Sequence, residues 1–285
     1  MKILLMGATG NAGTPAVKAL KAKGIRPSVA VRDIEKAKAK FGEGVDYVNF
    51  DFSKPETFGP ALEGVNKLFF IAPPPKKDPA IVKELVKVIK AKGVDFLLFQ
   101  SGRSSGGYKG KPLYEIEQFL GDCGLNVCIY RSAWYMQNFN TWMNTFLEDD
   151  EICLPTGKGK VSYIDLQDLG ECIAELLTTD GHAGKHYALT GGEAIDFWKV
   201  AECFSEGVGR KITYSNPSDE EYVTKMVAKG YPEKAAKYNL WLYGRVKDGC
   251  EEEVTTTAAE LLGRKPRTFL DFAKNEFQIK TTTSV

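Results

Sequence analysis

Short apolar runs alternate with amphipathic segments along most of the chain. Apolar runs of the kind that form strands buried on both faces occupy residues 2–6, 26–33, 45–53, 65–75, 94–102 and 125–133. Helical patterns occupy residues 14–24, 34–41, 53–64, 78–93 and 111–124. Strands that alternate with helices predict a parallel sheet with helices on both faces. We therefore expect an α/β fold with a doubly wound sheet.

Capping signals support the helix starts. Asp33 precedes the second helical pattern and can cap it. Ser53 and Glu56 have the spacing of a capping box. Asp78 followed by Pro79 predicts the start of a fourth helix, because proline suits the first helical position.

Three glycines separate the first strand from the first helix. Gly7 allows a tight turn, Gly10 removes a side chain where backbone must approach a pyrophosphate, and Gly13 lets the helix pack close to the strand. The N–H groups at the start of the helix would then face the anion. The sequence predicts a dinucleotide site here, and the alternative is a turn that is merely rich in glycine.

The residue that ends the second strand indicates the type of dinucleotide. A site for NAD(H) usually has Asp or Glu there, which accepts a hydrogen bond from the ribose 2′-hydroxyl. This chain has Arg32, which can bind a 2′-phosphate, and Lys36 lies one helical turn further on. We therefore expect NADP(H), and the alternative is that Arg32 is an ordinary surface residue.

The loops after the other strands should line the same crevice, because ligands bind at the carboxyl ends of parallel strands. This topology places six more residues near the dinucleotide: Asp51, Phe52, Ile71, Ala72, Pro73 and Ser101.

Composition and charge narrow the function further. The net charge of +1 gives no basic excess for nucleic acid or an anionic membrane, and no apolar run approaches the ~20 residues of a membrane span. The strand-like start leaves no room for a leader segment. Six cysteines without a C-x-x-C pair indicate buried thiols in a reducing cytoplasm. His182 and His186 lie in a glycine-rich stretch, so we expect no metal site.

Several motifs together resemble the NmrA-like branch of the atypical short-chain dehydrogenases. They are "GATGNAG", "VRDIEKA", "DFSKPETF", "YEIEQFL", "YRSAWYMQNF", "LPTGKGKVSYIDLQDLGECIAELL" and "GKHYALTGGEAI". The resemblance implies an NADP(H)-binding Rossmann domain, a small α+β C-terminal substrate lobe and a cleft between them. Its members include quinone, azo and triphenylmethane dye reductases and non-catalytic NADP(H) sensors. "FIAPPP" and "RTFLDFA" also resemble the ergot-alkaloid iminium reductases.

The resemblance also assigns site residues. The pyrophosphate would be held by Gly7, Thr9, Gly10, Asn11, Ala12 and Gly13, and the 2′-phosphate by Arg32 and Lys36. Asp51 and Phe52 would border the adenine, and residues 71–73 would lie along the ribose and nicotinamide.

The catalytic pattern departs from that of the wider superfamily. Standard short-chain dehydrogenases use Tyr-x-x-x-Lys with an upstream serine. Ser101 and Tyr114 are the candidates here, but the position four after Tyr114 is Gln118, which cannot lower a tyrosine pKa by charge. Two readings remain. Either a hydride passes from NADPH to a small acceptor that needs little acid help, such as a quinone, dye or iminium ion, or the protein senses NADP(H) without turnover.

Aromatic residues after the sixth strand are candidates for the acceptor pocket. Trp134, Tyr135 and Asn138 follow that strand, and the alternative is that they form a hydrophobic hinge. We expect residues 1–131, completed by about 161–191, to form the NADP(H)-binding core. Residues 132–160 and 192–285 would form the substrate lobe, and the protein would be a monomer or a homodimer.

Overall fold

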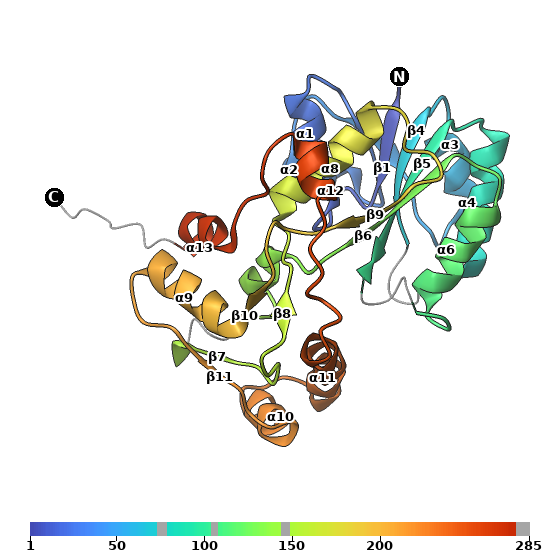
Figure 1. The fold of residues 1–285 in the computed structure, drawn as a ribbon. Coiled ribbons are helices and arrows are strands. Elements are labelled where there is room, and N and C mark those ends of the chain that lie inside the picture. Colours follow the sequence, from blue (N-terminus) through green and yellow to red (C-terminus); the bar gives the residue numbers. More distant parts are fainter. Residues whose placement is uncertain (73–78, 104–107, 144–148, 278–285) are drawn as a thin grey trace. The chain divides into compact units, whose positions relative to one another are not determined.

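The computed structural model describes residues 1–72, 79–103, 108–143 and 149–277 (Figure 1). The chain forms two compact units. Unit 1 consists of Met1–Ser132, Leu166–Leu189 and Thr257–Arg264, and unit 2 of Ala133–Asp165, Thr190–Thr256 and Lys265–Val285. Of the candidate residues, Pro73 lies outside the described residues, as does the expected cap Asp78.

Unit 1 contains a seven-stranded sheet in which all neighbouring strands are parallel. The strands are β1 (Ile3–Met6), β2 (Ser28–Val31), β3 (Asp46–Asn49), β4 (Lys67–Ile71), β5 (Phe96–Gly102), β6 (Val127–Ser132) and β9 (His186–Leu189). Their order in the sheet is β3-β2-β1-β4-β5-β6-β9. The predicted doubly wound parallel sheet is therefore confirmed.

Helices cover both faces of this sheet (Figure 1). They are α1 (Gly13–Ala22), α2 (Ile34–Phe41), α3 (Phe58–Ala61), α4 (Pro79–Ala91), α6 (Pro112–Asp122), α8 (Leu166–Thr178) and α12 (Thr257–Leu262). Helices α1 and α8 pack closely because Gly170 lacks a side chain. A Cβ built on Gly170 would lie 2.5 Å from the carbonyl carbon of Pro15.

The expected capping box at Ser53 and Glu56 is wrong. The chain forms a 3-10 turn η1 at Pro55–Thr57 and only then the short α3, and the residue before η1 is Lys54. The Ser53 N–H and hydroxyl donate instead to the Asp51 carboxylate, at 2.9 and 2.8 Å. Aspartate commonly binds backbone two residues further on, and this local turn removes Ser53 from the helix start.

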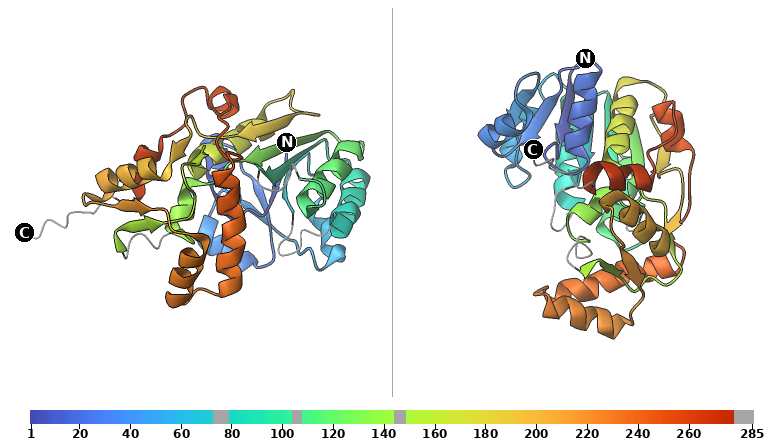
Figure 2. Two further views of the ribbon diagram at one scale, coloured as in Figure 1. Left: turned by 60° about the horizontal axis from the view of Figure 1, so that its bottom comes forward. Right: turned by 90° about the vertical axis from the view of Figure 1, so that its left-hand side faces the viewer.

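Unit 2 combines two small sheets with helices around an aromatic core. Its elements are η2 (Met136–Asn140), β7 (Glu151–Cys153), β8 (Lys160–Val161), β10 (Ile195–Asp196), α9 (Phe197–Val208), β11 (Thr213–Ser215), α10 (Asp219–Ala228), α11 (Glu233–Lys247) and α13 (Phe269–Phe277). Figure 2 shows α10 beside α11. In the core, the Phe139 ring packs edge-on against Phe204 and Phe269, with centroids 5.0 and 5.4 Å apart.

Most of the cysteine thiols lie inside the protein. Four of the six thiols are buried, and burial raises the pKa of Cys128 and of Cys172 to about 12. Cys250 is exposed, so the expectation of buried thiols is wrong for this residue. Across the described segments, no helix has the length and apolar character needed to cross a membrane.

Candidate cofactor site

The loop between β1 and α1 is folded so tightly that a side chain at Gly13 would overlap the loop backbone. Gly7 has a φ of +81°, in the left-handed region that favours glycine, and its N-terminal neighbour is the last residue of β1. A Cβ on Gly13 would lie 2.2 Å from the Gly7 carbonyl oxygen and 2.6 Å from the Ala8 Cα. The Gly10 N–H donates to the Gly7 carbonyl at 3.0 Å, which closes the turn. The loop is therefore a tight cradle with backbone at its surface.

The start of α1 is suited to an anion. Its N-cap is Ala12, which has no side chain that could accept from the first N–H groups, and its first turn holds no acidic residue. The first N–H groups of a helix lack intrahelical partners and carry partial positive charge. Thr9, Gly10 and Asn11 are exposed in front of this helix end. A pyrophosphate fits this arrangement.

The end of β4 borders the glycine loop at the centre of the sheet. A Cβ on Gly7 would lie 3.0 Å from Ile71 Cδ1. Ile71 is half-buried, and Ala72 after it is buried. Strand β1 lies between β2 and β4, which is where the strand order reverses and where ligands bind in doubly wound sheets.

Arg32 is exposed directly after β2. Within the described chain, its guanidinium makes no hydrogen bond or ion pair. The next residue, Asp33, caps α2 as expected, because its Oδ1 accepts from the Lys36 N–H at 3.0 Å. This cap fixes the start of α2 beside Arg32 and leaves the Lys36 ammonium exposed.

Lys40 is a further cation at this site that the sequence reasoning missed. Its Nζ donates to the Thr9 carbonyl at 2.9 Å, so it joins α2 to the glycine loop. Residues four apart share a helix face, and Lys36 therefore lies on the same face as Lys40. The spacing of Lys36 and Lys40 was visible in the sequence, but the contact with Thr9 depends on how α2 packs.

Asp51 and Phe52 follow β3. The Ser53 N–H and hydroxyl, bonded to the Asp51 carboxylate, hold its pKa below the usual value, and the charge of Arg32 contributes less. Asp51 therefore stays ionised near Arg32. The Phe52 ring packs edge-on against Phe50, with centroids 4.8 Å apart, and is partly buried at the edge of the core.

Ser101, Tyr114 and Gln118 differ in their surroundings. Ser101 lies on β5 with 3% of its surface exposed, and its Oγ has no hydrogen-bond partner among the described residues. Tyr114 is half-buried near the start of α6, and Gln118 is exposed one turn later on the same helix. A buried hydroxyl without a partner is unusual, and a bound water or a polar ligand would satisfy it.

The candidate acceptor residues lie in unit 2. Trp134 is 8% exposed and packs edge-on against Trp142 in the core, with centroids 6.0 Å apart. Tyr135 is half-buried and pairs with Ile164 through an isolated bridge. The Asn138 carbonyl accepts from the Thr141 hydroxyl at 3.2 Å. Trp134 is thus mainly a core residue, and Tyr135 and Asn138 are more accessible.

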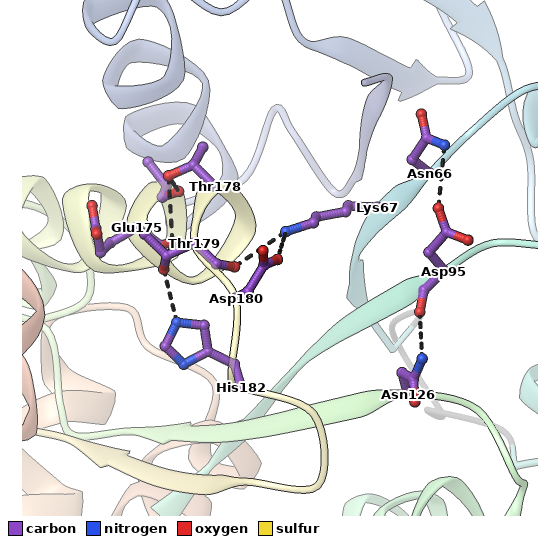
Figure 3. Close-up of polar contacts among 10 residues, drawn as sticks. Asn66, Lys67, Asp95, Asn126, Glu175, Thr178, Thr179, Asp180 and His182 are labelled. Carbon is purple, nitrogen blue, oxygen red and sulfur yellow. Dashed lines mark hydrogen bonds and ion pairs between the residues drawn. The ribbon is translucent and has the colours of Figure 1, made fainter.

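The two histidines lie near the amino ends of the strands. His182 Nε2 is 2.8 Å from Thr179 Oγ1 (Figure 3). Its Nδ1 is 3.0 Å from the Tyr187 hydroxyl. Among the residues that the structure describes, no three His, Cys, Asp or Glu side chains are grouped as a metal site requires.

Comparison with known proteins connects this geometry to a family. The model of the NmrA-like family matches residues 1–273. Prestalk A differentiation protein A of Dictyostelium discoideum is 31% identical, over 97% of this chain and 93% of that protein. NAD(P)H azoreductase of Xenophilus azovorans is 29% identical, over 95% and 96%. The crystal structure of Citrobacter sp. triphenylmethane reductase complexed with NADP(H) has a TM-score of 0.83 at 25% identity, over 96% and 99%. With a family match that extends over almost the whole sequence, the chain belongs to the NmrA-like family.

Proposed function

We propose that this protein is an NADPH-dependent oxidoreductase that passes a hydride to a small, flat or cyclic acceptor. The observation that carries the proposal is the glycine cradle before α1 together with the cations Arg32, Lys36 and Lys40. The cradle suits a pyrophosphate, and the three cations suit a 2′-phosphate, which NADPH has and NADH lacks. The names of the azo and triphenylmethane dye reductases support the same cofactor and acceptor class.

Each part of the site has a distinct task in this proposal. The backbone of residues 7–13 binds the pyrophosphate, and Arg32, Lys36 and Lys40 bind the 2′-phosphate. Asp51 and Phe52 border the adenine, and Ile71 and Ala72 lie along the ribose and nicotinamide. When bound, NADPH supplies the hydride. Residues that hold donor and acceptor at reacting distance contribute much of the rate in such a reaction.

Proton supply falls to Ser101, Tyr114 or water. The Ser101 Oγ lacks a protein partner among the described residues, so a hydrogen bond to the nicotinamide amide or to the acceptor would satisfy it. With Gln118 four residues after it, Tyr114 lacks the lysine of the standard pattern. We further propose that three residues of unit 2 bind the acceptor: Tyr135, Asn138 and the exposed edge of Trp134.

The test is consumption of NADPH by the purified protein with a panel of acceptors. The panel contains a quinone, an azo dye, a triphenylmethane dye and a cyclic iminium ion, with cofactor binding measured in parallel. We expect turnover of at least one acceptor. Tyr114→Phe tests the hydroxyl as proton donor, and Gln118→Ala is the control on the same helix. Absence of NADPH binding would contradict the whole proposal.

A second candidate is an NADP(H) sensor without turnover. The specific observation in its favour is Gln118 in place of the lysine. The relative from Dictyostelium is also named for differentiation and not for a reaction. Tight binding of NADPH with no consumption across the panel would favour the sensor.

A further inference from the structure

A partly buried ion pair lies near the carboxyl edge of the sheet, and the cofactor contacts proposed above do not involve it. Glu117 on α6 is 1% exposed. Its carboxylate accepts from Arg131 Nε at 3.1 and 3.2 Å and also from Arg131 Nη2. A carboxylate at this depth is costly unless it is paired, so the pair holds both side chains in one geometry.

The arginine lies beside the serine that lacks a partner. The α6 face of the sheet is formed by Leu97 and Phe99 of β5 and by Val127 and Ile129 of β6, which cluster with Leu113, Ile116 and Leu120 of α6. Side chains alternate along strands, so the next residues in these two rows are Ser101 and Arg131. They are register partners in the β5–β6 pair. Ser101 and Arg131 therefore lie side by side on the face that carries α6.

The preceding register pair supports this assignment. Gln100 and Tyr130 are also partners, and the Tyr130 hydroxyl donates to Gln100 Oε1 at 2.7 Å. Partner side chains on these strands thus share a face. β5 ends at Gly102 and β6 at Ser132, so Ser101 and Arg131 are each one residue from the edge where ligands bind.

The pair holds a guanidinium in a fixed position close to this edge. The Arg131 side chain is 36% exposed, whereas that of Glu117 is 1% exposed, so Arg131 is the member of the pair that solvent reaches. The hydrogen bond that Arg131 donates to the Glu117 carboxylate is the main reason that the pKa of Arg131 is raised. Such a group does not give up its proton, but it can stabilise a negative charge in its neighbourhood.

We propose that Arg131 donates a hydrogen bond to the acceptor atom that becomes negative during hydride transfer, and that Glu117 is its positioning residue. This inference rests on the reductase function proposed above. It assigns the chain to neutral acceptors that become anions, such as quinones and azo compounds. Cationic acceptors, such as triphenylmethane dyes and iminium ions, become neutral and gain nothing from Arg131.

The reaction balances with the reactants already named. The C–H bond at C4 of the nicotinamide of NADPH breaks, and its hydrogen and electron pair form a new bond to the quinone, which is reduced. NADPH is oxidised to NADP⁺, and the quinone becomes a monoanion. That anion forms beside Arg131 and then takes one proton from water, which gives the hydroquinone.

The test compares a neutral and a cationic acceptor in charge-changing variants. Wild type, Arg131→Met, Arg131→Lys and Glu117→Gln are assayed with menadione and with malachite green, and NADPH affinity is measured by fluorescence. We expect Arg131→Met to lower kcat with menadione by about 100-fold, as the loss of one oxyanion donor does elsewhere. Arg131→Lys should recover part of the rate. Turnover of malachite green and affinity for NADPH should stay close to wild type.

Two further variants keep the test decisive. Arg131→Met alone leaves a buried carboxylate unpaired, so the double variant Glu117→Gln/Arg131→Met removes both charges together and should show the same selective loss. Arg26→Met is the control. It removes an exposed arginine that pairs with Asp46 at the amino ends of the strands, and it should leave the turnover of both acceptors unchanged.

The outcomes separate the two proposals. Equal losses with both acceptors would show a structural pair and overturn this inference, as would full activity of the double variant with menadione. Wild-type turnover of malachite green without turnover of menadione would also overturn it. Wild type that binds NADPH but reduces neither acceptor would contradict the reductase function itself.

Discussion

Gly10 and Gly13 have different physical tasks in the same loop. A Cβ on Gly13 would lie 2.2 Å from the Gly7 carbonyl oxygen, whereas a Cβ on Gly10 would meet the same atom at 3.3 Å. Gly13→Ala therefore forces backbone to move, and we expect it to lower the free energy of unfolding by about 1–3 kcal/mol and to weaken NADPH binding. Gly10→Ala should weaken NADPH binding with little change in stability. Urea unfolding and NADPH titration measure both quantities.

Gly121 provides the matched control for these substitutions. It lies in α6 with nothing within 4 Å of its added Cβ. Gly121→Ala should raise the free energy of unfolding by about 0.5–1 kcal/mol through helix propensity and leave NADPH binding unchanged. Equal effects of Gly10→Ala and Gly13→Ala on stability would contradict the division of tasks.

Lys40 should contribute to NADPH affinity, although no sequence motif marks it as a cofactor residue. Its ammonium is fixed on the Thr9 carbonyl, within the loop that we propose binds the phosphates. We expect Lys40→Met to weaken NADPH binding by about 3–10-fold, with a smaller effect on NADH. Lys38→Met is the control, because Lys38 lies on the same helix but pairs with Glu35. An equal loss of affinity in Lys38→Met and Lys40→Met would show that α2 contributes only its overall charge.

At the scale of elements, the connection from α8 to β9 contains a pH-sensitive contact. Thr179 Oγ1 donates to the Glu175 carbonyl at 2.7 Å, so its only hydrogen is used and it accepts from His182 Nε2. His182 Nδ1 then accepts from Tyr187. The neutral ring therefore satisfies every partner. Burial, and after it the charge of Lys67, hold the pKa of His182 below its usual 6.5.

This lowered pKa fixes the direction of a pH effect. The stability that His182 contributes is fully present above the unfolded-state value of 6.5 and is lost as the pH falls through the folded value. We expect the free energy of unfolding to fall more for wild type than for His182→Gln between about pH 7.5 and pH 5. If the two proteins lose stability in parallel, the pKa of His182 does not change between the folded and unfolded states.

Element boundaries show where local patterns suffice and where they fail. The strands and α1, α2, α4 and α6 follow from hydrophobic periodicity and capping residues such as Asp33, which act over one or two turns. The start of α3 does not follow from local patterns. Ser53 suits both a helix cap and a local turn, and its hydrogen bonds to the Asp51 carboxylate select the turn. Helix α12 is only Thr257–Leu262, too short for periodicity to reveal it.

At the scale of the whole molecule, strand alternation predicted the parallel sheet because crossover connections allow few topologies. The glycine loop could be located from the sequence, since its spacing between strand and helix is itself local. Contacts between segments that lie far apart in the sequence could not be located in this way. Lys40 reaches Thr9 across 31 positions, and Arg264 of unit 1 bonds the buried Asp168 across 96. The pairing of Glu117 with Arg131 also depends on how α6 packs against β6.

The most direct test of the central claim is the ratio of the dissociation constants for NADH and NADPH in wild type and in Arg32→Ala. If Arg32 binds the 2′-phosphate, wild type should prefer NADPH by about 100-fold, since a charge-assisted bidentate contact contributes about 1.5–3 kcal/mol and two lysines assist it. Arg32→Ala should reduce that ratio by about tenfold or more through weaker binding of NADPH alone. Equal affinity of wild type for both cofactors, or a variant that weakens both equally, would contradict the assignment of this site to NADPH.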